Sequence, residues 1–189
     1  VEALARLNIP VAVFRATSFS ELFALIGRLG TLLGAEAEAK TLVAALSARL
    51  DRVRAAVAQL PRPRVIFEIR YPNLLLAGQG SIVTEVIARA GGVNALENDK
   101  ALVRASEEEV VRLNPEAYLV QRGPMNPDPV PLADRPQYRD LAALKENRVF
   151  VVDEQRFSRP GPRLVDAVEE LAGLLHPETK AALEGGRHE

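Results

Sequence analysis

Two clusters of side chains in this sequence are suited to binding a small molecule. They are Tyr71, Pro72 and Asn73, which follow a strand expected at 64–69, and Arg156, Phe157 and Arg159, which follow a strand expected at 149–152. Aromatic rings offer stacking area, and a phenol or guanidinium adds donors that suit carboxylates, amides or phosphate. The alternative is that these residues are rim positions or loop anchors. Met125 and Asn126, in a proline-rich loop, are weaker candidates of the same kind.

The sequence contains none of the usual patterns for catalysis. It has no phosphate-binding loop with a lysine, no nucleophile elbow and no pair of histidines on one helix. Both histidines, His176 and His188, lie far from the two clusters, and the absence of cysteine excludes thiolate chemistry and sulfur metal sites. The segment Gly78-Gln79-Gly80-Ser81 either holds an anion on its amide groups or simply starts a helix. We therefore expect a chain without catalytic residues, a metal site or an intrinsic cofactor.

Composition limits the partners further. The 189 residues are 48% hydrophobic and 26% charged, which fits one large or two small globular domains. A formal net charge of -1 argues against nucleic acid, because phosphate-binding proteins carry a basic excess. No apolar run reaches the roughly 20 residues that cross a bilayer, and no signal peptide is visible.

Two consecutive helical patterns occupy residues 18–60. The first, at 19–33, opens with Ser18 and Glu21 at capping-box spacing, and Gly34 ends it. The second, at 35–59, has one narrow apolar stripe on a mostly charged rod, formed by Leu42, Leu46, Leu50, Val53 and Val57. At about 1.5 Å per residue this rod is roughly 37 Å long. It is either part of a helical hairpin in an ordinary domain or a strut between two bodies.

The rest of the chain, 61–189, reads as an α/β lobe. Strands expected at 64–69, 117–121 and 149–152 alternate with helices, which predicts a three-layer lobe with a mainly parallel sheet and helices on both faces. Ligands of such sheets bind beyond the carboxyl ends of the strands. Here that edge consists of the loops 70–80, 122–136 and 153–159, which include both clusters.

The first residues look like the end of another unit. Residues 1–7 read as the end of a helix, and Val11 to Phe14 as a buried strand. A chain that begins inside a strand–helix–strand unit looks as if residues upstream, targeting segments included, have been lost. We expect Val11 to Phe14 to be a guarded sheet edge or to pair with another copy, which would allow self-association.

Taken together, these stretches resemble the periplasmic solute-binding proteins of importers for cobalamin, siderophores and haem. Four stretches carry the resemblance: 18–60, 62–92, 106–120 with its Leu113-Asn114-Pro115-Glu116-Ala117 phrase, and 147–175 with Phe157-Ser158-Arg159-Pro160-Gly161-Pro162-Arg163. The family has two α/β lobes joined by one long helix. The resemblance implies that 1–17 is the remnant of an amino-terminal lobe, 18–60 the interlobe strut and 61–189 the carboxyl-terminal lobe.

The resemblance also assigns residues. The ligand-facing ring position after the first strand falls at Tyr71 or Leu75, and the last ligand loop at Arg156 to Arg159. The acid that docks on arginines of the membrane permease falls at Glu108. Cobalamin binders often place a tryptophan just before that helix, whereas Leu102 stands there in this chain.

The function implied is capture of a metal chelate between two lobes and delivery to an ABC permease. A corrinoid is the preferred ligand, with haem or a ferric siderophore as the alternative. The implied location is the periplasm, either free or lipid-anchored. A nitrogenase-like α/β enzyme or scaffold domain is a third possibility, but it would need cysteine or histidine ligands near the strand ends, and the sequence has none there.

Overall fold

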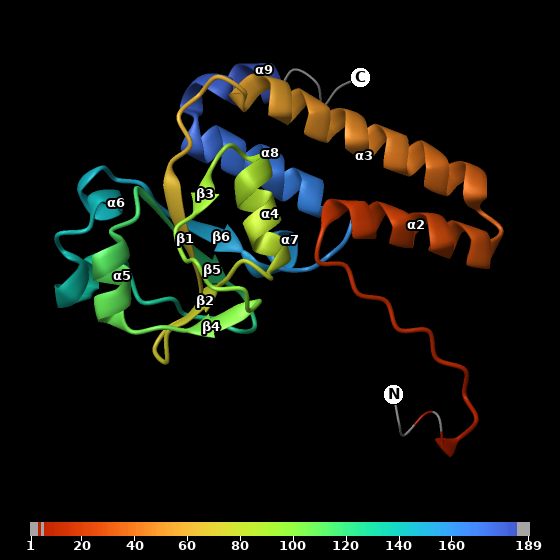
Figure 1. Ribbon diagram of the computed structural model, residues 1–189, viewed down its shortest axis with the longest axis horizontal. Helices are drawn as coiled ribbons and strands as arrows, with labels where there is room; N and C mark the ends of the chain where they lie inside the picture. Colours follow the sequence, from red (N-terminus) through yellow and green to blue (C-terminus); the bar gives the residue numbers. More distant parts are fainter. Residues whose placement is uncertain (1–3, 5, 185–189) are drawn as a thin grey trace.

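The computed structural model describes residue 4 and residues 6–184. Figure 1 shows an α/β lobe from which a pair of helices projects. Within the described residues, no helix is long and apolar enough to cross a membrane. Most of the helix end expected at 1–7 lies outside the described residues.

A mixed sheet forms the centre of the lobe (Figure 1). Its strands among the described residues are β1 (Arg64–Arg70), β2 (Leu75–Ala77), β3 (Val93–Asn94), β4 (Leu102–Arg104), β5 (Ala117–Arg122) and β6 (Val149–Asp153). The order is β4-β2-β1-β5-β6, and β3 pairs with the start of β1. Because β1, β5 and β6 are parallel, their carboxyl ends meet at one edge, as the sequence predicts. The antiparallel pairs β1–β2 and β2–β4 were not predicted.

Helices cover both faces of the sheet, which confirms the three-layer prediction. Val65 and Phe67 of β1 pack toward α4 (Ile82–Arg89) and α8 (Leu164–Leu175). Ile66, between them in β1, belongs to the core on the opposite face. That second face is covered by α5 (Glu107–Leu113), α6 (Ala142–Lys145) and the 3-10 turns η1 (Leu132–Asp134) and η2 (Pro136–Tyr138). The remaining short elements are α7 (Glu154–Phe157), η3 (Pro177–Thr179) and α9 (Lys180–Glu184).

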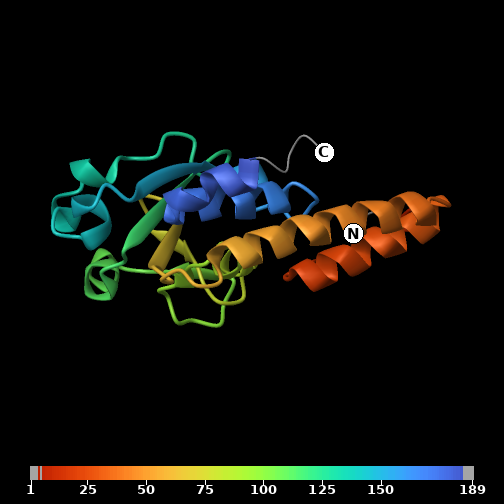
Figure 2. The same cartoon turned by 90° about the horizontal axis from the view of Figure 1, so that it is seen from above.

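The projecting pair consists of α2 (Phe19–Leu33) and α3 (Glu36–Val57). Gly34 joins them with φ 66°, in the left-handed region that glycine adopts at little cost. The two helices approach so closely at Gly30 that a Cβ there would lie 2.5 Å from the Cβ of Ala39. Figure 2 shows this hairpin extending well beyond the lobe. The prediction of one long uninterrupted helix is confirmed.

The apolar stripe of α3 becomes buried toward the carboxyl-terminal end of the helix, and α3 contacts α8, α9 and α4. Leu46, Leu50 and Val53 are at most 5% exposed, whereas Leu42, predicted to belong to the same apolar stripe, is 39% exposed. Beside the apolar contacts, Arg49 donates to Glu169 of α8 at 2.6 and 2.9 Å and to Asp166 at 2.6 Å. These charge-assisted bonds raise the pKa of the Arg49 guanidinium. They fix the rotation of α3 about its own axis.

The prediction of a buried strand at Val11 to Phe14 is wrong. The structure assigns no regular element to residues 9–16, and Val13 is 58% exposed. A run of β-branched residues becomes a strand only when a neighbouring strand accepts its backbone hydrogen bonds, and no described strand pairs with this segment. Self-association through a sheet edge at this segment therefore has no support here, and the boundary at 17/18 stays a prediction.

Candidate functional site

A hollow lies beyond the carboxyl ends of β1 and β5, where the sequence predicts a ligand. Its volume is about 540 Å³, within the usual range for small-molecule pockets. We call it the strand-end hollow; its lining residues are Arg70, Tyr71, Pro72, Asn73, Arg104, Met125, Asn126, Pro127 and Asp128. Arg70 is the last residue of β1, and the next three residues come from the loop after it. Arg104 belongs to β4, and the last four residues belong to the loop after β5.

Hydrogen bonds hold the loop after β5 in place. Asn126 is 2% exposed and donates its side-chain amide to the carbonyl of Gln121 at 2.9 Å. The backbone amide of Met125 donates to the carboxylate of Glu154 in α7 at 2.8 Å. Met125 itself is 41% exposed at the hollow. The loop therefore presents a polarizable apolar side chain from an anchored backbone.

The loop after β1 is fixed just as firmly. The hydroxyl of Tyr71 donates to Glu107 of α5 at 2.7 Å, and the Arg135 guanidinium lies 3.7 Å from the centre of the Tyr71 ring. The hydrogen bond to Glu107, followed by burial, raises the pKa of the Tyr71 phenol. Asn73 closes the turn with φ 60°, a conformation that asparagine tolerates better than most residues.

The hollow carries more positive than negative side chains. Arg70 and Arg104 flank the same edge, because Leu75 of β2 is paired with each of them on opposite sides. Nε of Arg70 is buried without a hydrogen-bond partner among the described residues. Asp128 is the one carboxylate in the lining. This balance suits a ligand with carboxylate or phosphate groups.

The structure brings only part of the predicted site together. Tyr71, Pro72 and Asn73 line the strand-end hollow. Arg159 is 62% exposed, with its guanidinium 3.8 Å from Glu154, the same carboxylate that anchors Met125. It therefore lies near the hollow without being one of its lining residues.

Three predicted ligand residues lie elsewhere. Leu75 is 9% exposed in the core beneath the hollow. Phe157 is fully buried, because the single turn of α7 directs its ring onto Phe67, with the ring centres 6.2 Å apart. Arg156 binds Glu170 of α8 and lines a different hollow, between α7, α8 and α9. None of these three side chains lines the strand-end hollow.

Sequence reasoning missed Arg104 and Arg135. Arg104 ends a three-residue strand, which has no detectable periodicity. Arg135 forms a buried ion pair with Glu68, at 2.6 Å. Glu68 was the available signal, since a carboxylate inside an otherwise apolar strand needs a buried cationic partner.

Glu108, the predicted docking acid, is exposed. It is the second residue of α5, next to the Glu107 that binds Tyr71. Hydrogen bonds to its own backbone amide and to Ser106 lower the pKa of the Glu108 carboxyl, so it is ionised at neutral pH.

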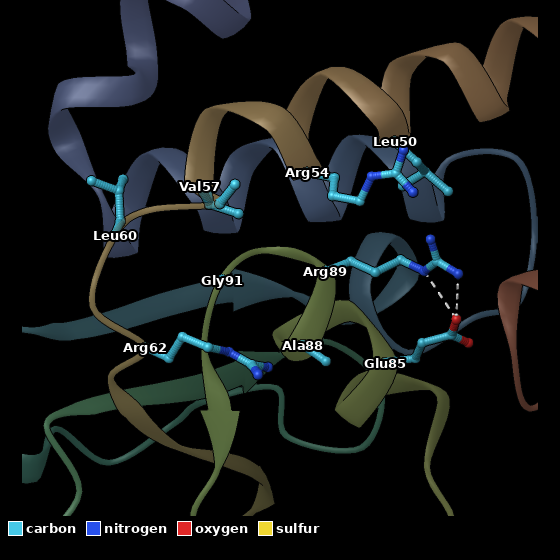
Figure 3. A pocket seen from close by; sticks show the side chains of 10 residues that line it. Leu50, Arg54, Val57, Leu60, Arg62, Glu85, Ala88, Arg89 and Gly91 are labelled. Atoms are coloured by element: carbon cyan, nitrogen blue, oxygen red, sulfur yellow. Dashed lines mark hydrogen bonds and ion pairs between the residues drawn. The ribbon is translucent and has the colours of Figure 1, made fainter.

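A second hollow, of about 380 Å³, lies between α3 and α4 (Figure 3). Its lining includes Leu50 and Val57 of α3, Arg89 of α4 and Arg62, which precedes β1. It therefore lies at the opposite end of β1 from the strand-end hollow. The described residues contain no cluster of three or more acidic, histidine or cysteine side chains that could hold a metal ion.

Comparison with known proteins identifies the family. Residues 2–156 match the model of the family described as "Periplasmic binding protein". The chain belongs to this family. A relative in the family is the ABC transporter substrate-binding lipoprotein YvrC of Bacillus subtilis, itself uncharacterised, with 29% identity over 168 residues, covering 87% of this chain and 52% of YvrC.

One further relative and one solved structure extend the comparison. The vitamin B12-binding protein of Pectobacterium carotovorum is 24% identical over 181 residues, covering 93% of this chain and 62% of the relative. The structure of IsdE of S. aureus complexed with heme superimposes with a TM-score of 0.77 at 22% identity, covering 92% of this chain and 70% of IsdE, which shows the shared fold. The chain thus spans between half and two thirds of the length of the two curated relatives.

Proposed function

We propose that this chain provides one wall of the ligand site in a substrate-binding protein of an ABC importer. In this proposal the protein captures a metal-chelate nutrient outside the cytoplasmic membrane and delivers it to a membrane permease; it binds and does not catalyse. The observation that carries the proposal is the strand-end hollow, together with the family of the chain. The lipoprotein YvrC supports an extracytoplasmic location, either free or lipid-anchored.

A corrinoid is the preferred ligand class. The B12-binding relative supports it, and the haem complex of IsdE supports haem as the alternative, with a ferric siderophore as a further one. Arg70 and Arg104 suit acidic groups on the periphery of any of these chelates. The raised pKa of Tyr71 works against a phenolate ligand to the metal, because metal binding requires a deprotonated oxygen. We therefore infer that the hollow recognises the edge of the chelate rather than its metal ion.

Binding of three probes tests this function: cyanocobalamin, haemin and a ferric hydroxamate, each titrated into the complete binding protein that contains this chain and followed by amide chemical shifts. We expect shifts in the loops after β1 and β5, and Arg104→Ala or Met125→Ala should weaken binding about tenfold, equivalent to about 1.4 kcal/mol. Arg156→Ala is the matched control and should leave affinity unchanged, because its guanidinium is bound to Glu170. Failure of all three probes to bind, or an equal effect of the control, would contradict the proposal.

Docking on the permease has a separate test. Charge reversal in Glu108→Lys should reduce uptake by the assembled importer while ligand affinity stays the same, since the carboxylate is exposed outside the hollow. Glu146→Lys is the control, an exposed acid beyond the end of α6. Normal uptake with Glu108→Lys would reject Glu108 as the docking residue.

A further inference from the structure

A buried ion pair lies beneath the strand-end hollow. Arg135 is 2% exposed, and its guanidinium donates to both carboxylate oxygens of Glu68, at 2.6 and 2.8 Å. The hydroxyl of Tyr118 donates to the same carboxylate at 2.7 Å, and the carbonyl of Val130 accepts a further bond from Arg135 at 2.7 Å. Because Glu68 belongs to β1 and Tyr118 to β5, Arg135 is fixed to the two central strands.

Tyr71 stands between this ion pair and the hollow. The Arg135 guanidinium lies 3.7 Å from the centre of the Tyr71 ring, a cation–π contact. Tyr71 lines the hollow, whereas Arg135 does not. The position of this wall of the hollow therefore depends on a side chain from the next loop.

The same tyrosine reaches the helix that carries Glu108. Its hydroxyl donates to Oε1 of Glu107 at 2.7 Å, and Glu107 is the first residue of α5. The phenol has a single proton to donate. If a bound ligand accepts the hydrogen bond from the Tyr71 hydroxyl, Glu107 loses that bond. Ligand binding in the hollow would therefore remove a contact that stabilises the first turn of α5.

We propose that Arg135 is a positioning residue of the ligand site and that Tyr71 and Glu107 link this site to α5, so that ligand occupancy is sensed at the docking helix. The docking role of α5 rests on the proposed function. The link itself is a property of this chain, and experiments without any ligand or permease can test it.

Titration of the tyrosines is the first test. The chain has three tyrosines and no tryptophan, so tyrosinate absorbance reports them alone. Burial raises the pKa of Tyr118 well above its ordinary value and that of Tyr138 to about 12, so Tyr71 is expected to titrate first. Tyr71→Phe should remove this first step and thereby identify it.

Two variants should move the Tyr71 step in opposite directions. Glu107→Gln should lower the pKa of Tyr71, because the bond to the carboxylate is the largest cause of its increase. Arg135→Met should raise it further, because the guanidinium stabilises the phenolate, and Arg135→Lys should restore the wild-type step. The controls Glu109→Gln and Arg139→Met lie in the same helix and loop and should change nothing. A purely structural role predicts instead that both test variants shift the pKa toward 10, and that result would overturn the positioning role.

Amide hydrogen exchange tests the link to α5. Tyr71→Phe keeps the ring over Arg135 but removes the donor to Glu107, so exchange at Val110 to Leu113 should accelerate several-fold. Tyr138→Phe is the matched control and should leave these amides unchanged. Unchanged exchange in Tyr71→Phe would overturn the link even if ligand binding and docking are confirmed. If Arg135→Met fails to fold, Glu107→Gln and this exchange measurement still decide the outcome.

Discussion

Truncation of leucines along α3 should show where this helix is supported. Leu46 is 4% exposed, whereas Leu42, one turn earlier, is 39% exposed. Leu46→Ala removes about three methylene equivalents from a buried site, worth about 2.4 kcal/mol at roughly 0.8 kcal/mol each. The cavity left behind adds to this loss, so we expect about 3 kcal/mol in total. Leu42→Ala, at a solvated position, should cost less than about 1 kcal/mol.

Urea unfolding followed by circular dichroism measures both free energies. With a slope of about 2 kcal/mol per molar urea, Leu46→Ala should lower the midpoint by about 1.5 M and Leu42→Ala by less than about 0.5 M. The slope should stay constant, because neither variant changes the surface exposed on unfolding. Equal midpoints for the two variants would refute the conclusion that α3 is buried at Leu46 and solvated at Leu42.

Two further predictions concern the helical hairpin and the buried tyrosines. Gly27→Ala should stabilise α2 by about 0.5–1 kcal/mol, because a Cβ there meets no atom within 4 Å. Gly30→Ala should destabilise the hairpin by about 1–3 kcal/mol, because the new Cβ would collide with Ala39. Thermal melts of both glycine variants measure these effects. A higher melting temperature for Gly30→Ala would contradict the predicted collision. Burial raises the pKa of the Tyr138 phenol to about 12 in the folded state, whereas its pKa is near 10 in the unfolded state. As pH rises, the unfolded state therefore loses the phenol proton before the folded state does. The free energy of unfolding should be at its full value below pH 10 and should fall between pH 10 and 12. Urea midpoints across that range should show a weaker decline for Tyr138→Phe, and a midpoint that does not change with pH would refute the assignment.

The longer elements could be predicted because their sequences repeat with a clear period. The apolar stripe from Leu46 to Val57 predicted α3, and the apolar runs at β1, β5 and β6 predicted the parallel core of the sheet. β2 and β4 have three residues each, and such short segments become strands only when tertiary structure brings a partner alongside. Their antiparallel pairing was therefore beyond sequence reasoning.

The candidate site was predicted by position more than by side chain. Tyr71 was found because it follows a buried strand, and the same reasoning selected Phe157. The two residues differ in their contacts in the fold: α7 turns Phe157 into the core, while Arg135 and Glu107 hold Tyr71 at the hollow. The contacts of Tyr71 cannot be read from the sequence near it, since Arg135 lies 64 positions after Tyr71.

The two contact seams of α3 also determine which changes of length this helix tolerates. Its first half meets α2 at Ala39 and its second half meets α8 at Arg49. Inserting one residue between them would rotate one seam about 100° relative to the other and break one of the two contacts. Inserting seven residues, close to two whole turns, would keep both seams in phase and move the tip of the hairpin about 10 Å outward. The distance between the two seams can therefore change only in steps of whole turns, and buried side chains between the seams, such as Leu46, remain constrained by their packing.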